Sequence, residues 1–145
     1  MARRTVVLLS VLIGLSSSFA FAADEFTEIA KTDKFTYYLV NDGKVRKGDK
    51  VKAWVLQDFI DPQPHPYLDF YKSIIYQAEY DCTARESRTL FLVRYFDHMR
   101  TGKVTEKVSS PEALYEPHVP GTIGDELRSA VCRSSDSTPA RGNAR

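Results

Sequence analysis

The chain has 145 residues, with 20 basic and 19 acidic side chains, 43% hydrophobic residues and two cysteines. This length suits one domain and is short for two. The near balance of charge gives no electrostatic reason to expect nucleic acid or an anionic membrane as a partner, which argues against both classes of binding protein.

The first 22 residues predict a secretory signal peptide. Two arginines near the start are followed by an apolar stretch from Val6 to Leu15 and by the small residues Ala20 and Ala22. The apolar stretch holds about ten residues and falls short of the roughly 20 that cross a bilayer. We therefore expect cleavage before Ala23, in preference to an uncleaved N-terminal anchor.

The remaining 123 residues carry 18 basic and 19 acidic side chains, because the leader holds two of the arginines. They contain no further apolar run long enough to form a transmembrane segment. Position 23 is alanine, whereas a bacterial lipoprotein needs an acylated cysteine there. We expect an exported protein, either periplasmic or secreted to the cell surface or medium, that is not a lipoprotein.

Both cysteines, Cys82 and Cys132, follow the leader. An oxidising compartment would pair them in a disulfide, and closing a loop of about 50 residues stabilises a fold by roughly 4 kcal/mol. The alternative is two free thiols that take part in redox or metal chemistry. That alternative has little support because the cysteines lack Cys-x-x-Cys spacing and have no neighbouring histidine in the sequence.

Five segments rich in β-branched and aromatic residues predict strands. They span residues 35–40, 51–59, 71–82, 89–97 and 104–108. Residues 23–34 are polar and predict a flexible arm, and residues 61–66 hold three prolines and predict a loop. Because turns and not helices connect the strands, we expect an α+β fold with a mainly antiparallel sheet of about five to six strands.

One helix is predicted near the C-terminus, with Thr122 as its N-cap and Asp125 three residues later. Its apolar stripe consists of Ile123, Leu127, Ala130 and Val131. A helix of about nine residues needs to dock on the sheet, and the disulfide would tether it there. Because Cys132 projects away from the stripe on a regular helix, we expect fraying at Val131. Residues 133–145 are expected to form a disordered tail.

The strands at 51–59 and 89–97 carry apolar side chains on both faces. A sheet that is apolar on both faces needs cover on both faces, and one short helix covers only one of them. Loops of the chain, a ligand or a second protomer would cover the other face. Of these alternatives we favour a homodimer.

No pattern of residues predicts an active site. The three histidines lie in or beside predicted loops without a ligand-spaced partner: His65, His98 and His118. The aspartates around the proline segment match no calcium loop: Asp58, Asp61 and Asp69. We therefore expect solvated side chains with no catalytic residue, metal or cofactor. An enzyme that uses the proline segment and His65 is the least favoured hypothesis.

Several short motifs occur in a recognisable order. They are Val51-x-x-Trp54, Tyr71-x-Ser73, Tyr80-Asp81-Cys82 followed by Arg85 and Arg88, and Pro120-Gly121-Thr122 leading to Val131-Cys132. In these features the chain resembles the surface-adhesin protein E family of exported bacterial proteins over residues 35–132. The resemblance implies a curved antiparallel sheet with a C-terminal helix that the Cys82–Cys132 disulfide fastens to it.

The resemblance also implies a non-enzymatic role in binding host matrix and plasma proteins such as laminin, vitronectin and plasminogen, and it implies dimerisation. The chain departs from the lipid-anchored adhesin because Ala23 stands where the acylated cysteine would be. No ligand-binding residue can be carried over, since the matching positions look structural. The alternative hypothesis is a periplasmic accessory or inhibitor protein that binds another bacterial protein or a small apolar ligand.

Overall fold

The computed structural model describes residues 25–67 and 69–133. The elements run in chain order as β1 (Phe26–Lys31), β2 (Phe35–Val40), β3 (Val45–Lys47), β4 (Lys50–Gln63), β5 (Tyr71–Asp81), β6 (Glu86–Tyr95), the 3-10 turn η1 (His98–Arg100), β7 (Val104–Ser109), β8 (Glu116–Pro117) and α1 (Ile123–Cys132). The predicted signal peptide and residues 134–145 of the predicted tail lie outside the described residues.

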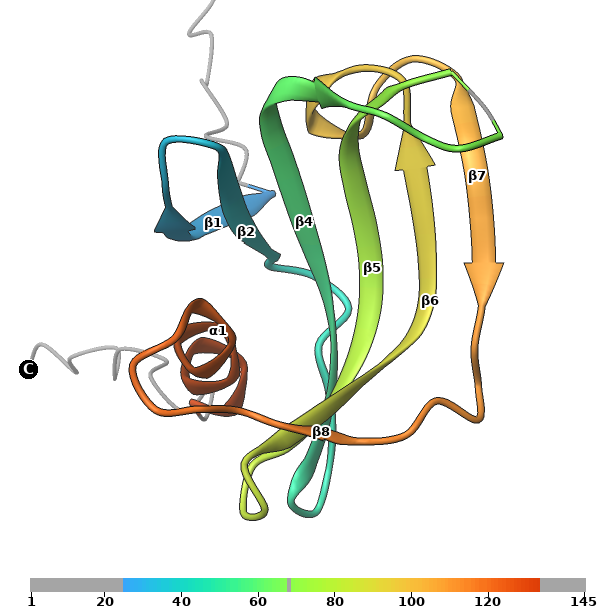
Figure 1. Ribbon diagram of the computed structural model, residues 1–145. Coiled ribbons are helices and arrows are strands. Elements are labelled where there is room, and N and C mark those ends of the chain that lie inside the picture. Colours follow the sequence, from blue (N-terminus) through green and yellow to red (C-terminus); the bar gives the residue numbers. More distant parts are fainter. Residues whose placement is uncertain (1–24, 68, 134–145) are drawn as a thin grey trace, which may run out of the picture.

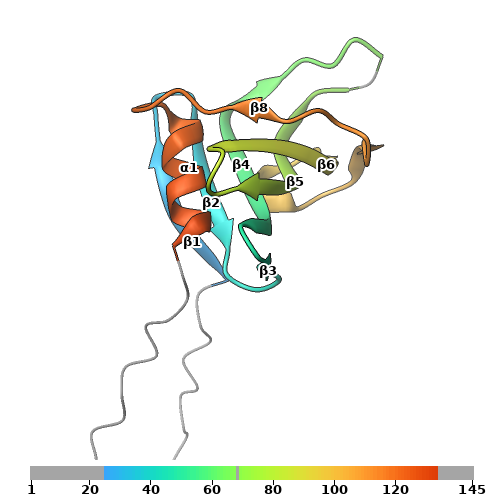
Figure 2. The same ribbon diagram turned by 90° about the horizontal axis from the view of Figure 1, so that it is seen from below.

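The strands form one eight-stranded sheet whose main path is β1-β2-β4-β5-β6-β7, with β3 added beside β4 and β8 beside β6. Every strand pair is antiparallel. The long central strands bend, and α1 lies against the face of the sheet near β1 and β2 (Figures 1 and 2). The predicted α+β fold with a curved antiparallel sheet is confirmed, and β3 and β8 are short additions to the expected number of strands.

The predicted flexible arm over residues 23–34 is wrong where β1 forms. This strand pairs with β2 along the edge of the sheet, with an irregularity between Glu28 and Ala30. Its first residue, Phe26, packs against Tyr38 with the ring centroids 6.3 Å apart. The polar side chains that suggested an arm occupy the exposed positions of an edge strand, which begins at Phe26.

The predicted loop over residues 61–66 is also partly wrong, because β4 continues to Gln63. Gln63 pairs with Tyr71 of β5 after a shift of register that begins at Asp58. On the other side of β4, pairing with β2 ends at Phe59. Pro62 therefore lies where β4 has a neighbour on one side, and a proline without an N–H group is tolerated in such an edge position.

The helix α1 covers one face of the sheet. Its N-cap is Thr122 as predicted, whose Oγ1 accepts a hydrogen bond from the backbone N–H of Asp125 at 3.4 Å. Its buried side chains are Leu127, Ala130 and Val131. Val131 belongs to an apolar cluster with Val51, Ala53, Ala78 and Tyr80. Burial of this stripe, together with the disulfide, holds a helix that is too short to be stable alone.

The disulfide joins Cys82 to Cys132 with the two Cα atoms 5.7 Å apart. The expected fraying at Val131 is wrong, because α1 stays helical through Cys132. Cys82 lies in the turn after β5 and not within the strand, so it is free to approach the helix away from the apolar stripe. The carbonyl of Cys132 accepts a hydrogen bond from Arg46 at 2.6 Å, and that of Arg133 accepts one from Lys44 at 3.2 Å. These cations stabilise the C-terminal end of the helix dipole.

The opposite face of the sheet is also apolar, as expected. Its buried cluster consists of Val40, Leu56, Ile75 and Val93. Phe26 of β1 and Met99 of η1 pack against this cluster, so residues of the same chain cover it. The apolar second face therefore no longer requires another protomer, and homodimerisation stays a prediction that rests on the family resemblance.

The turn η1 is anchored by Ser73, whose side chain is buried in β5. Ser73 Oγ donates to the carbonyl of Asp97 at 2.6 Å and accepts from the N–H of Arg100 at 2.9 Å. Met99 and Arg100 have φ of 52° and 55°, which is unfavourable for residues with a side chain. These hydrogen bonds therefore hold the turn in a strained backbone conformation.

We expect Ser73→Ala to lower the free energy of unfolding by about 2 kcal/mol, because it leaves a partly buried carbonyl and a partly buried N–H without their partner. Urea denaturation followed by circular dichroism measures the change. The control is Ser109→Ala on the exposed side of β7, which should change stability by less than about 0.5 kcal/mol. Equal stability of the two variants would show that Ser73 does not anchor η1.

Candidate binding surface

The connection between β4 and β5 presents an exposed aromatic side chain on a stiffened segment. Three prolines, at positions 62, 64 and 66, restrict its backbone. Tyr67 follows them and is 89% exposed. In Figure 1 the connection extends from the ends of β4 and β5 towards the start of β7. An aromatic ring of this exposure on a restricted segment is available for contact with another molecule.

Polar contacts fasten this connection to β7 and to the residue before it. His65 Nε2 lies 3.4 Å from Glu106 Oε2, and Glu106 also pairs with Arg94. Lys103 Nζ donates to Asp69 Oδ2 at 2.8 Å, and this hydrogen bond lowers the pKa of the Asp69 carboxyl. The Lys103–Asp69 pair is exposed and contributes little to stability, whereas the two contacts of Glu106 are partly buried. Together they determine where the connection lies relative to the sheet.

Phe70, which is exposed, and Phe96, which is half-buried, form a tilted aromatic pair near the end of the same connection. The ring centroids of Phe70 and Phe96 are 4.4 Å apart. Lys103 Nζ lies 5.1 Å from the centre of the Phe96 ring, and Lys72 Nζ lies 5.8 Å from that of Phe70. We call the residues of this surface the hairpin platform: Tyr67, Phe70, Lys72, Phe96 and Lys103.

The hairpin platform combines features that are common at the centres of protein interfaces. Aromatic side chains dominate binding energy there, and cations beside aromatic rings add electrostatic attraction. A segment stiffened by prolines loses less entropy when it binds. The arrangement can therefore hold a partner that offers an apolar recess with carboxylates at its rim. Sequence reasoning missed these residues, although the prolines next to Tyr67 were a usable signal.

The three histidines are not brought together. His65 pairs with Glu106, and His98 Nδ1 lies 3.2 Å from Asp58 Oδ2. The prediction of solvated loop side chains is wrong for His65, whose side chain is 12% exposed, and for His118, which is half-buried and hydrogen-bonds to Ser87 Oγ at 2.9 Å. Burial is the main cause that lowers the pKa of His118. Within residues 25–67 and 69–133, no three histidine, cysteine or acidic side chains group closely enough to hold a metal ion.

The three aspartates around the proline segment make different contacts. Asp58 accepts a hydrogen bond from the N–H of Met99 at 2.7 Å and so supports η1. Asp69 is bound by Lys103, and Asp61 is exposed. These contacts are structural or peripheral and do not form a pair of carboxylates for acid–base chemistry.

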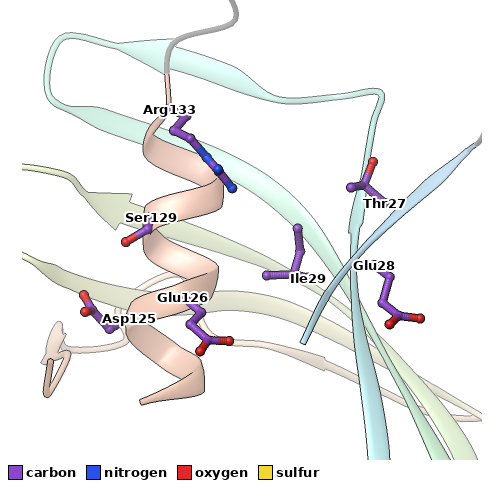
Figure 3. Close-up of a pocket in the computed structure, with 7 residues that line it drawn as sticks. All are labelled: Thr27, Glu28, Ile29, Asp125, Glu126, Ser129 and Arg133. Carbon is purple, nitrogen blue, oxygen red and sulfur yellow. The ribbon is translucent and has the colours of Figure 1, made fainter. Parts of the chain in front are cut away.

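A cleft of 440 Å³ lies between β1 and α1. Figure 3 shows the Ile29 side chain directed towards the helix, while the Glu28 carboxylate turns away from it. Asp125 accepts hydrogen bonds from Arg128 at 2.8 Å and from Arg85 at 2.9 Å. The hydrogen bond from Arg128 is the main cause that lowers the pKa of Asp125 to about 2, and the one from Arg85 adds to it. Because its carboxylates do not converge and one of them is already paired, the cleft offers no evident chemistry.

A buried carboxylate fastens residues before β8 to the sheet. Glu79 is 8% exposed and accepts hydrogen bonds from Arg88 at 2.7 Å and from the Tyr115 hydroxyl at 2.6 Å. Lys52 lies 3.7 Å away. The hydrogen bond from Tyr115 is the main cause that lowers the pKa of Glu79. This network is fully paired, so we assign it to stability.

The fold and its surface define a small α+β domain closed by a disulfide, with an exposed aromatic platform at one end. The family model for surface-adhesin protein E matches residues 26–133, and the chain belongs to this family. Its structure is similar to that of Haemophilus influenzae protein E, with a TM-score of 0.55 and 11% sequence identity over 77% of this chain and 86% of that chain. At this identity the likeness shows the fold alone. A comparison with curated proteins gives no match.

Membership of this family identifies the chain as a surface adhesin and not an enzyme. It confirms the resemblance found in the sequence, and it extends the matched region to Phe26, which agrees with the position of β1. The family also indicates an exported or cell-surface protein. Across the described residues, no helix is long and apolar enough to cross a membrane.

Proposed function

We propose that this protein is an exported adhesin that binds a host matrix or plasma protein through the hairpin platform. Family membership supports adhesion. The observation that carries the choice of surface is the 89% exposure of Tyr67 on the same connection that carries Phe70, whose ring is paired with that of Phe96. Such a combination of exposed aromatic area and fixed geometry is uncommon on a surface that has no partner.

The chemistry of the platform determines the kind of partner. Tyr67 would enter an apolar recess, and the Phe70–Phe96 pair would pack beside it. Lys72 is 3.7 Å from Asp97, and Lys103 is hydrogen-bonded to Asp69, so both lysines are already partly neutralised. The aromatic contacts therefore supply most of the affinity, and the lysines favour a partner with acidic residues at the rim.

The test measures binding of the purified, disulfide-bonded protein to immobilised laminin, vitronectin and plasminogen, with serum albumin as the reference surface. We expect saturable binding to at least one of the three, and at least a tenfold loss of affinity for Tyr67→Ala and for Phe70→Ala. The matched control is Leu114→Ala, which removes an apolar side chain that is 86% exposed outside the platform.

Two results would contradict the proposal. Absence of saturable binding to all three proteins would remove the proposed partners. Equal affinity of Tyr67→Ala, Leu114→Ala and the unaltered protein would leave adhesion in place but assign it to another surface.

Sedimentation of the same preparations at micromolar concentration tests homodimerisation, for which we expect a dimer.

We propose that the chain reaches the periplasm or the cell exterior by its leader and is not lipid-anchored. The support is Ala23 at the expected new N-terminus and the closed disulfide, which an oxidising compartment favours. A protein released in this way would act as a bridging adhesin, or it would be retained at the surface by a second protein.

A further inference from the structure

The hairpin formed by β3 and β4 carries a dense group of cations. Five basic residues lie within nine positions: Lys44, Arg46, Lys47, Lys50 and Lys52. In the antiparallel pairing Lys47 lies opposite Lys50, and Val45 lies opposite Lys52. Because side chains alternate between the two faces of a strand, these four residues share one face. Figure 1 shows the turn of this hairpin at the lower end of the sheet, away from the connection between β4 and β5.

A recess of 270 Å³ opens on this face. We call its lining the basic recess: Val45, Lys47, Lys50, Lys52 and Glu79. Glu79 is the one carboxylate among the described residues that line it, and Glu79 already accepts hydrogen bonds from Arg88 and Tyr115. The basic recess shares no residue with the hairpin platform.

Two lysines of the basic recess are only loosely paired. Lys50 Nζ lies 3.6 Å from Asp81 Oδ2, and Lys52 Nζ lies 3.7 Å from Glu79 Oε2. The side chains of the two lysines are 46% and 47% exposed, so water screens both contacts. Arg88 competes with Lys52 for Glu79 at the shorter distance of 2.7 Å. Both ammonium groups therefore remain available to another anion.

The third lysine, Lys47, is exposed and makes no hydrogen bond or ion pair within the part of the chain that the structure describes. It lies directly opposite Lys50, and like charges in that arrangement destabilise a pair of strands. Asp49, in the turn between them, is exposed and does not line the recess. With Arg88 and Asp81 included, four cations face two carboxylates. An anion bound between Lys47 and Lys50 would relieve their repulsion.

The size and lining of the basic recess favour a sugar polymer over a nucleic acid. Its volume is below the roughly 300–1,000 Å³ of sites that enclose a small molecule, so it suits one unit of a longer chain. Nucleic-acid bases bind by stacking on aromatic rings, and no aromatic residue lines the recess within the described chain. Val45 is 60% exposed and offers apolar contact to the carbon–hydrogen face of a sugar ring.

We propose that the basic recess binds a sulfated polysaccharide, with one sulfated sugar held between Lys47, Lys50 and Lys52. The ammonium groups donate charge-assisted hydrogen bonds to sulfate oxygens, and Val45 packs against the sugar ring. Polymers of this kind occur in extracellular matrix, where an exported adhesin would meet them. The inference goes beyond binding of a matrix or plasma protein, because both the residues and the class of partner differ from those of the hairpin platform.

The test titrates the full chain, purified after export with its disulfide formed, with a heparin hexasaccharide and follows backbone amide signals by NMR. We expect saturable shifts within residues 44–52 and a Kd of about 100 μM or tighter in about 20 mM salt. Raising the salt to about 500 mM should weaken binding at least tenfold. A hyaluronan hexasaccharide, which has carboxylates and no sulfate, should bind at least tenfold more weakly, and so should a single-stranded DNA oligonucleotide of equal charge.

Two variants connect binding to the basic recess. Lys47→Gln removes a lysine that contacts no other described residue, so we expect the fold to persist and the affinity for the heparin hexasaccharide to fall about fivefold. The double variant Lys47→Gln and Lys50→Gln should lose at least tenfold. The matched controls are Lys107→Gln, on an exposed position of β7, and the double variant Lys31→Gln and Lys107→Gln, neither of which should change the affinity by more than about twofold.

Three results would overturn the proposal. The first is the absence of saturable shifts with the heparin hexasaccharide at low salt. The second is an equal loss of affinity for the Lys47→Gln and Lys107→Gln variants, which would indicate attraction by overall charge and not by the recess. The third is equally tight binding of hyaluronan or of the DNA oligonucleotide, which would show that the recess does not select sulfated sugars.

Discussion

The double substitution Cys82→Ser and Cys132→Ser is expected to lower the free energy of unfolding by about 4 kcal/mol. The bond joins residues that are 50 positions apart, so its loss restores a large amount of chain entropy to the unfolded state. It also releases α1, whose ten residues depend on docking. Because small domains have a net stability of about 5–15 kcal/mol, this change removes a large fraction of it.

Urea denaturation at neutral pH, followed by circular dichroism, measures this loss. The unaltered protein in the presence of a reducing agent serves as the control, and it should lose a similar amount of stability. If the double variant and the unaltered protein unfold at the same urea concentration, then packing of Leu127, Ala130 and Val131 alone is enough to hold the helix.

The second large effect is expected for Glu79→Ala, which should lower the free energy of unfolding by about 3 kcal/mol. Removing this buried carboxylate leaves the Arg88 guanidinium without its partner and deprives the Tyr115 hydroxyl of its acceptor. The matched control is Glu112→Ala, at an exposed position, for which we expect a change below about 0.5 kcal/mol. Comparable urea midpoints for the two variants would contradict the assignment of Glu79 to stability.

The same pair of proteins tests the pH dependence. The pKa of Glu79 in the folded protein is lowered from 4.5, so its stabilising effect is complete above the pKa of the unfolded state and is lost as the pH falls through the folded value. The stability difference between the unaltered protein and Glu79→Ala should therefore be larger at pH 7 than at pH 3. A constant difference across this range would show that ionisation of Glu79 does not matter.

Local patterns were enough to predict much of the fold. The segment 71–82 was correctly predicted as a strand from its β-branched and aromatic residues, and the structure forms it over Tyr71–Asp81. Thr122 was correctly predicted as the N-cap, because capping depends on neighbouring residues. The edge strand β1 was missed because its exposed alternate positions are polar. Its strand conformation depends on pairing with β2, a contact that composition does not reveal.

The candidate site was far less predictable, because it depends on contacts between distant residues. Phe70 meets Phe96, and Asp69 meets Lys103, only when β5, β6 and β7 are paired. The proline segment was visible in the sequence, but nothing local indicated which residues would lie beside it.

The most direct test of the account is mass spectrometry of the native protein from fractionated cells, without reduction. We expect a chain that begins at Ala23, occurs outside the cytoplasm and is lighter by two hydrogens than after reduction. Recovery of the chain in the cytoplasm with its leader attached, or with both sulfurs as free thiols, would contradict an exported adhesin closed by the Cys82–Cys132 bond.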